Sequence, residues 1–185
     1  MQLETERLLL RPFTMDDFYD VYSYSSVLQN VYFMEWGPSD EAATKDFLLR
    51  CENHWKVTPV THYDFAIIHK ELDKVIGGCG VYLSEGRQEG MLGWILHRSF
   101  WKKGYGTEMG KALLKFGFED LNLHHIYAEC NTDNYGSYRV MENIGMRREA
   151  HFVQNKFGRV GGKQTWYDQY HYGILNDEWQ NKSNN

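Results

Sequence analysis

The spacing of apolar and polar residues predicts a chain in which β-strands and α-helices follow one another. Apolar residues that alternate with polar ones indicate strands, whereas apolar residues three or four positions apart indicate amphipathic helices. We expect seven strands, which cover about residues 5–13, 61–69, 75–83, 91–96, 125–130, 147–157 and 164–175. We expect four helices, which cover about residues 14–28, 39–55, 107–121 and 134–144. No repeat or linker interrupts this order, so we predict a single domain over residues 1–179 and a polar tail over residues 180–185.

One stretch, from Gly90 to Glu119, carries a candidate binding site. It is predicted to form a strand, then a turn that contains Gly104 and Gly106, and then a helix. The first backbone N–H groups of a helix have no partner within the helix and lie at the positive end of its dipole. Glycines ahead of them let a ligand approach the backbone closely, and such a turn binds phosphate groups. The alternative is an ordinary helix start flanked by solvated lysines.

Composition narrows the class of protein. The chain has 185 residues, of which 42% are hydrophobic, and a net charge of −5. This length supports a core of its own, and the acidic charge argues against nucleic acid as the main partner. No apolar run is long enough to span a membrane and the charged N-terminus is unlike a signal peptide, so we expect no membrane partner. Three distant cysteines fit the buried, reduced thiols of a cytoplasmic protein, and eight histidines show no zinc-type spacing, so no metal is predicted.

Three motifs, in order along the chain, resemble the GNAT superfamily of acetyl-CoA-dependent N-acetyltransferases. They are TERLLLRPFTMDD at residues 5–17, GWILHRSFWKKGYGTE at 93–108 and NTDNYGSYRVMENIGM at 131–146. The branch that they resemble most contains the ribosomal-protein N-terminal (alanine/serine) acetyltransferases. A lone Gly-x-Gly is a weak signal, whereas three motifs at the family's spacing are a strong one. The resemblance implies a mixed α/β (α+β) fold, with a twisted, mostly antiparallel seven-stranded sheet, a splay between its central strands and about four helices on its two faces.

The resemblance also implies that acetyl-CoA is the co-substrate, and it assigns residues to its binding. The strand before the turn would pair through its backbone with the pantetheine amides, and one of its N–H groups would be an oxyanion donor. The turn and the start of the helix would hold the pyrophosphate. The residues assigned in this way are Trp94, Ile95, Leu96, Lys102, Lys103, Gly104, Tyr105, Gly106, Thr107, Asn134 and Ser137.

Two positions depart from the common pattern of the superfamily. Many members have a tyrosine seven residues after the motif's asparagine, as the acid for the leaving thiolate, but Met141 stands here. The ribosomal-protein branch has a serine at the place of Ser137, so we expect Ser137 to assist the departing sulfur; the alternative is a plain first-turn serine. Trp101 replaces the Gln or Arg that often stands three residues before the first glycine, and the branch tolerates an aromatic residue there. Asn134 can cap its helix and also bind the co-substrate.

The acceptor side is less defined. The acceptor would be a primary amine, either the α-amine of a protein N-terminus or a small-molecule amine, and a carboxylate or histidine would accept its proton. Among Glu35, Glu85, Glu89 and Glu129 we favour Glu35, because it lies in an aromatic loop at the expected acceptor mouth. Aromatic side chains can hold a peptide backbone, an alkyl stem or a cation. Those expected at the acceptor site are Tyr32, Phe33, Trp36 and Trp166.

Two interpretations stay open at this point. The first is an N-acetyltransferase that is a cytoplasmic monomer or homodimer. The second is a non-catalytic acyl-CoA-binding or sensor module, which the missing tyrosine and the unidentified proton acceptor leave possible. A nucleotide-dependent phosphotransferase is set aside, because Lys103 precedes its glycines instead of following them.

Overall fold

The computed structural model of the chain describes residues 1–86 and 88–183. Eight strands form one sheet in the order β1-β2-β3-β4-β5-β6-β8-β7. The strands are β1 (Leu3–Glu4), β2 (Leu8–Pro12), β3 (His62–His69), β4 (Lys74–Leu83), β5 (Glu89–Leu96), β6 (His125–Asn131), β7 (Arg147–Val160) and β8 (Lys163–Leu175). The α-helices are α1 (Phe18–Ser25), α2 (Glu41–His54), α3 (Tyr105–Lys115), α4 (Tyr135–Asn143) and α5 (Asn176–Ser183). Three short helical turns complete the order: η1 (Met15–Asp17), η2 (Arg98–Phe100) and the π-helical η3 (Phe116–Asp120).

The mixed α/β fold with a mostly antiparallel sheet is confirmed, with two differences of detail. The sheet has eight strands because the two-residue β1 pairs with β2 through Leu3 and Leu10, and such a short strand leaves no alternating pattern. The fifth helix, α5, takes in residues 180–183 of the expected polar tail. Its sequence is polar almost throughout, so it lacks the regularly spaced apolar residues by which a helix is predicted. Residues 184 and 185 lie outside the described part of the chain.

The central strands β5 and β6 separate along their length. They are the one parallel pair of neighbours in the sheet, and their pairing covers three residue pairs, from Glu89–His125 to Met91–Tyr127. β5 continues to Leu96 along β4, while β6 continues to Asn131 along β8. The two strands therefore leave a gap in the sheet beyond Met91, which is the expected splay.

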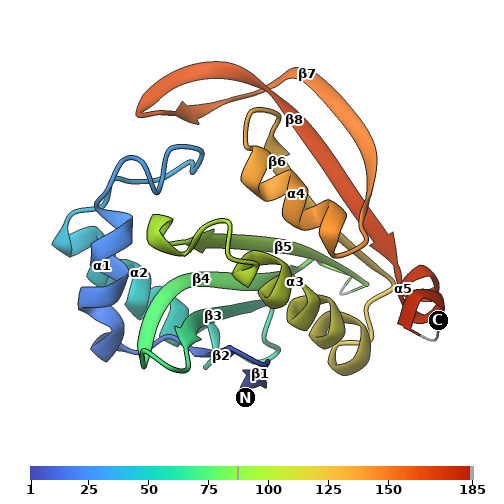
Figure 1. Cartoon of the computed structure of the whole chain (residues 1–185), viewed down its shortest axis with the longest axis horizontal. Helices are drawn as coiled ribbons and strands as arrows, with labels where there is room; N and C mark the ends of the chain where they lie inside the picture. Colours follow the sequence, from blue (N-terminus) through green and yellow to red (C-terminus); the bar gives the residue numbers. More distant parts are fainter. Residues whose placement is uncertain (87, 184–185) are drawn as a thin grey trace.

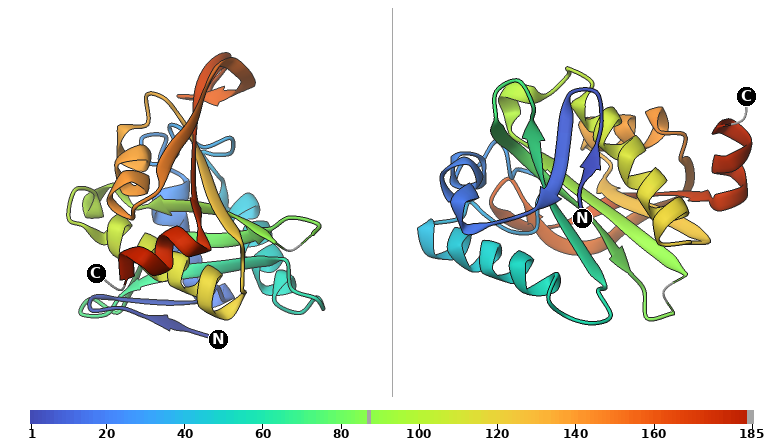
Figure 2. Two further views of the ribbon diagram at one scale, coloured as in Figure 1. Left: turned by 90° about the vertical axis from the view of Figure 1, so that its right-hand side faces the viewer. Right: turned by 90° about the horizontal axis from the view of Figure 1, so that it is seen from below.

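Helices cover both faces of the sheet around this gap. Figures 1 and 2 show α1 and α2 on one face and α3 with α4 on the other. Neighbouring residues of β3 pack to opposite sides, since Ile67 belongs to the apolar cluster under α3 and Ile68 to the cluster under α1 and α2. The β7–β8 hairpin arches away from the sheet (Figure 1) and reaches the loop after α1, where the N–H of Gly161 donates to the carbonyl of Tyr32 at 2.8 Å.

Candidate functional site

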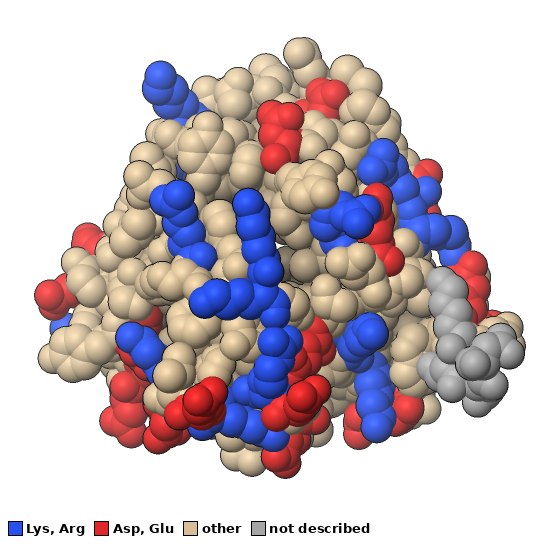
Figure 3. Space-filling model, viewed as in Figure 1, with Lys and Arg blue, Asp and Glu red and all other residues tan. Residues whose placement is uncertain are grey.

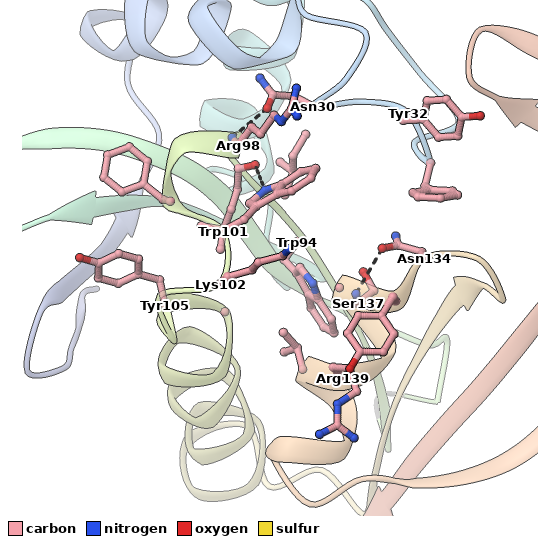
Figure 4. A pocket seen from close by; sticks show the side chains of 18 of the residues that line it. Asn30, Tyr32, Trp94, Arg98, Trp101, Lys102, Tyr105, Asn134, Ser137 and Arg139 are labelled. Carbon is pink, nitrogen blue, oxygen red and sulfur yellow. Dashed lines mark hydrogen bonds between the residues drawn. The ribbon is translucent and has the colours of Figure 1, made fainter.

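A cavity of about 820 Å³ lies where β5, α3 and α4 meet. Its walls are the loop after α1, the end of β5, the turn before α3 with the first turn of α3, and one side of α4 (Figure 4). Most of the residues predicted for the site from the sequence line this one space. They are Tyr32, Phe33, Trp94, Ile95, Leu96, Lys102, Gly104, Tyr105, Gly106, Thr107, Asn134 and Ser137.

The hydrogen-bonding direction of β5 leaves backbone groups facing the gap. The N–H of His97 donates to β4 at 2.7 Å, and backbone groups of a strand point to alternate sides, so Ile95 also faces β4. Trp94 and Leu96 therefore turn their N–H and C=O groups toward β6, whose pairing with β5 ends at Met91. These two N–H groups are donors at the edge of the cavity, whereas the main chain of Ile95 is engaged with β4.

The turn before α3 has the backbone geometry of an anion site. Lys102 has φ +60° and Gly104 has φ +83°, values that glycine adopts readily and other residues rarely. Gly106 lies in the first turn of α3 against α4, where a Cβ atom would lie 2.8 Å from Val140 Cγ2. That distance is shorter than carbon atoms pack, so Gly106 lets the two helices that flank the cavity come close together.

The first turn of α4 presents polar groups to the same space. The Oδ1 atom of Asn134 accepts from the N–H of Ser137 at 3.2 Å and so caps the helix, which leaves the Asn134 Nδ2 donors available. The Ser137 side chain lines the cavity, and its hydroxyl has no hydrogen-bond partner among the described residues. Met141 is 1% exposed and belongs to the apolar core, so the position of the common tyrosine is filled here by a packing residue.

The charge around the cavity suits an anionic ligand. Arg98, Lys102 and Arg139 line it, against the carboxylate of Asp133 in the lining and that of Glu142, which pairs with Arg139 at 2.7 Å. Figure 3 shows Lys and Arg side chains gathered over the middle of the face that carries α3 and α4. Cations at a helix N-terminus that already attracts anions strengthen the preference for phosphate groups.

Four of the predicted residues do not line the cavity. The ammonium of Lys103 lies over the ring of Phe100, 5.6 Å from its centroid. The carboxylate of Glu35 forms an ion pair with Lys156 at 2.8 Å, which ties the loop after α1 to β7. Trp36 is partly exposed on that loop, and Trp166 packs on Phe157 across the β7–β8 hairpin.

The structure adds Asn30, which the sequence did not single out, and explains Trp101, which it did. Asn30 is 7% exposed; it donates to the carbonyl of Tyr24 at 3.1 Å and accepts from the N–H of Arg98 at 2.8 Å. It thereby joins the loop after α1 to the start of η2, just beyond β5, and no spacing pattern in the sequence reveals such a bridge. The indole N–H of Trp101 donates to the carbonyl of Leu96 at 2.8 Å, so an aromatic residue at this position has a structural purpose.

The cysteines are poorly suited to covalent catalysis. Cys51, Cys79 and Cys130 are free and buried, and burial raises the pKa of each thiol, that of Cys130 to about 12. A thiol with such a pKa is scarcely ionised at neutral pH, and the thiolate is the reactive form. The described residues therefore favour direct transfer over a cysteine-bound acyl group.

The described part of the chain lacks two further features, a metal-binding cluster and a membrane-spanning helix. No group of three or more His, Cys, Asp or Glu side chains there is arranged to hold a metal ion. None of its helices combines the length and apolar character needed to cross a membrane.

Comparison with known proteins agrees with this geometry. Residues 7–147 match the family model of the acetyltransferase (GNAT) domain. The chain is 34% identical over 179 residues to the N-acetyltransferase YnaD of Bacillus subtilis (strain 168), which covers 97% of this chain and 99% of the relative. A GNAT-family acetyltransferase from Bacillus anthracis superposes with a TM-score of 0.82 at 32% identity, over 96% of this chain and 100% of that one.

More distant structures share the fold. The ribosomal-protein-S5-alanine acetyltransferase of Vibrio fischeri superposes with a TM-score of 0.79 at 20% identity, over 97% of this chain and 98% of that one. The spermidine N-acetyltransferase of Vibrio cholerae, solved with CoA and spermine, gives the same TM-score at 17% identity, over 95% and 99% of the two chains. With the family model spanning 141 of the 185 residues, the chain belongs to the GNAT acetyltransferases and is an acetyl-CoA-dependent N-acetyltransferase.

Proposed function

We propose that this enzyme acetylates a primary amine, which is either the α-amine of a protein N-terminus or a small-molecule amine, by direct attack on the thioester. The observation that supports this most is the gap between β5 and β6, where two backbone donors border one cavity with the N-terminal ends of α3 and α4. We place the protein in the cytoplasm, because three buried free thiols fit a reducing compartment.

The residues around the turn before α3 would hold the donor. The N–H groups from Gly104 to Thr107 would face the diphosphate and Lys102 would supply charge, whereas Lys103 lies outside the cavity with its ammonium over Phe100. Trp94 and Leu96 would pair through their backbone with the pantetheine arm, and Asn134 would donate to it from the other side of the gap. Bound acetyl-CoA supplies the activated thioester carbonyl, so the chain's own residues have to orient it and stabilise charge.

Particular residues would assist the formation of the carbon–nitrogen bond and the cleavage of the carbon–sulfur bond. The amine nitrogen bonds to the carbonyl carbon, and the N–H of Trp94 or Leu96 stabilises the negative charge that develops on the carbonyl oxygen. As the carbon–sulfur bond breaks, the hydroxyl of Ser137 donates to the departing sulfur. The proton that the amine loses passes to a carboxylate and from there to the solvent. The departing thiolate takes the proton of the Ser137 hydroxyl, the serine regains one from the solvent, and the products are an amide and the free thiol of coenzyme A.

Two carboxylates are candidates for the proton acceptor. Glu35 stays our first proposal, because its loop reaches the cavity through Tyr32 and Phe33. Glu129 is the second, because it lies on β6 two residues beyond the last pair with β5 and so flanks the gap. The side chain of Glu129 is 37% exposed and bonds to Nδ1 of His171 at 3.2 Å, which gives the proton a route onward.

The acceptor pocket would form between the loop after α1 and the β7–β8 hairpin. Tyr32 and Phe33 lie at the cavity and meet edge to face, with ring centroids 4.9 Å apart. Trp36 and Trp166 are exposed outside the cavity, at 39% and 57%, and would contact the part of a peptide or amine that extends away from the reacting nitrogen. We propose that the enzyme works as a monomer or homodimer.

Thiol release with acetyl-CoA, measured across a panel of N-terminal peptides and small amines, tests the proposal. We expect release that depends on the amine, with one class preferred in kcat/KM. A preference for ribosomal-protein N-terminal peptides would place the chain in the branch that its motifs resemble, and a preference for small amines would remove it from that branch. Acetyl-CoA binding without thiol release toward any amine would support the sensor interpretation instead.

A further inference from the structure

The segment before β2 holds the turn before α3 from outside the cavity. The carboxylate of Glu108, in the first turn of α3, accepts from the Thr5 hydroxyl at 2.6 Å and from the Arg7 N–H at 2.8 Å. It also accepts from Nε of Arg7 at 2.7 Å and pairs with Nη2 at 2.6 Å. An exposed ion pair normally uses one or two such contacts, so four donors on one carboxylate indicate a geometry that is held in place.

The same arginine bonds directly to the turn. Nη1 of Arg7 donates to the carbonyl of Lys103 at 3.0 Å. The carbonyl and the N–H of a trans peptide point in opposite directions, so this bond turns the N–H of Gly104 away from Arg7 and toward the cavity that Gly104 lines. Lys102, next to this peptide, has φ +60°, a conformation that a residue other than glycine keeps only with support from its surroundings.

A second contact supports the first turn of α3. The guanidinium of Arg7 lies over the ring of Tyr105, 4.3 Å from its centroid, and the Tyr105 hydroxyl bonds to Nε2 of His69 at 2.7 Å. Nδ1 of His69 accepts a hydrogen bond from the N–H of Leu72 at 3.3 Å, so a neutral His69 carries its proton on Nε2. The Nε2–H group then donates a hydrogen bond to the hydroxyl oxygen of Tyr105. Tyr105 is thus fixed between β3 and Arg7.

We propose that Arg7 is a positioning residue, which holds the Lys103–Gly104 peptide so that its N–H group is directed at the diphosphate of the donor. Arg7 does not line the cavity and acts through Lys103, Tyr105 and Glu108. This inference rests on the proposed donor site. It goes further in making the N-terminal segment a determinant of donor affinity.

Calorimetric titration with two ligands tests the inference. Coenzyme A carries the diphosphate, whereas pantetheine keeps the thiol arm that would lie along β5 and lacks the diphosphate. We expect Arg7→Met to weaken coenzyme A binding about tenfold, the value of a hydrogen bond between charged and polar groups, and to change pantetheine binding less than twofold. Arg50→Met, on the exposed surface of α2, is the matched control and should change neither affinity.

A charge-conserving variant separates geometry from long-range electrostatics. The single ammonium of Arg7→Lys cannot reach the Lys103 carbonyl and both Glu108 oxygens at once, so we expect a similar loss of coenzyme A affinity. Full recovery in Arg7→Lys, equal losses for coenzyme A and pantetheine in Arg7→Met, or no loss at all would each overturn the positioning role. Wild-type protein that does not bind coenzyme A would overturn the proposed donor site, and the role of Arg7 with it.

Discussion

At the scale of single residues, the start of α4 combines a helix cap at Asn134 with the proposed partner of the departing sulfur at Ser137. Asn134 uses Oδ1 to cap the helix and keeps its Nδ2 donors, while Ser137 keeps an unpartnered hydroxyl at the cavity. The motif in the sequence was enough to select both residues. Glu35 was selected by its place in an aromatic loop, and its ion pair with Lys156 on a distant strand could not be foreseen, because it depends on how the hairpin folds back.

Replacing Ser137 with alanine tests its role in the departure of sulfur. Ser137→Ala should lower kcat about a hundredfold, the lower end of the effect of one lost donor at a developing charge, and leave the affinity for coenzyme A nearly unchanged. The Ser137 N–H that caps the helix is kept in the variant, so the fold should be intact. Steady-state kinetics with titration of coenzyme A makes the measurement, and an unaltered kcat would exclude Ser137 as the proton donor.

The identity of the proton acceptor can be decided with two isosteric variants. If Glu35 accepts the proton, Glu35→Gln should lower kcat at least tenfold, whereas Glu129→Gln should leave kcat unchanged. The reverse result would assign the role to Glu129. An unchanged kcat in both variants would mean that neither carboxylate accepts the proton.

At the scale of elements, the strand, turn and helix from β5 to α3 form the part of the site that the sequence predicted best. Positive φ and close helix packing require glycine at particular positions, and a free helix N-terminus favours polar residues, so these features can be read from the sequence. The contacts that hold this unit in place require no such recurring residue type. Arg7 and Glu108 are 101 positions apart, and Asn30 and Arg98 are 68 apart, so these pairs depend on tertiary packing alone.

Gly104→Val should abolish coenzyme A binding without unfolding the protein. A β-branched residue disfavours the φ of +83° at this position, and its Cβ would lie 3.3 Å from Nη2 of Arg7, so the turn has to change shape. Gly86→Val, in an exposed turn where a Cβ would meet no atom within 4 Å, is the control. Titration of coenzyme A and circular dichroism make the measurement; binding retained by Gly104→Val would mean that the diphosphate lies elsewhere.

The Glu108 contacts predict a pH-dependent stability. Burial alone raises the pKa of Glu108, but the hydrogen bonds from Thr5 and Arg7 outweigh it and hold the pKa below its ordinary value of 4.5. The folded state then binds the proton less well than the unfolded chain, so the stabilisation is present above about pH 4.5 and is lost as the pH falls through the folded-state pKa. Glu108→Gln should lower the Tm by about 3 °C at pH 7 and by less at pH 3.

Thermal melts of Glu108→Gln at several pH values make this measurement. The matched control is Glu119→Gln, which removes an exposed pair with Lys115 at 3.8 Å and should change the Tm by less than a degree at every pH. A difference between Glu108→Gln and the wild type that stays constant from pH 7 to pH 3 would contradict the account of Glu108.

At the scale of the whole molecule, the residues proposed for the donor and for the acceptor lie on different parts of the chain. The proposed donor residues belong to β5, α3 and α4, which pack on the core under α3. The expected acceptor walls belong to the loop after α1 and to the β7–β8 hairpin, which meet through Glu35–Lys156 and through the Gly161–Tyr32 backbone bond. Relatives with the same core can therefore differ in their acceptors through these two segments, which is why the sequence defines the donor more sharply than the acceptor.

Shortening the hairpin should separate the two functions. Deleting Arg159, Val160, Lys163 and Gln164 removes two cross-strand pairs and keeps Gly161–Gly162 as the turn, so the register of the remaining pairs and the face of each side chain are conserved. The new tip cannot reach Tyr32, and the bond from Gly161 is lost.

We expect the KM for the preferred amine to rise at least fivefold while the affinity for coenzyme A stays within twofold, because no residue of the tip lines the donor cavity. Equal weakening of both ligands would show that the hairpin supports the donor site too, and an unchanged KM for the amine would remove the hairpin from the acceptor pocket.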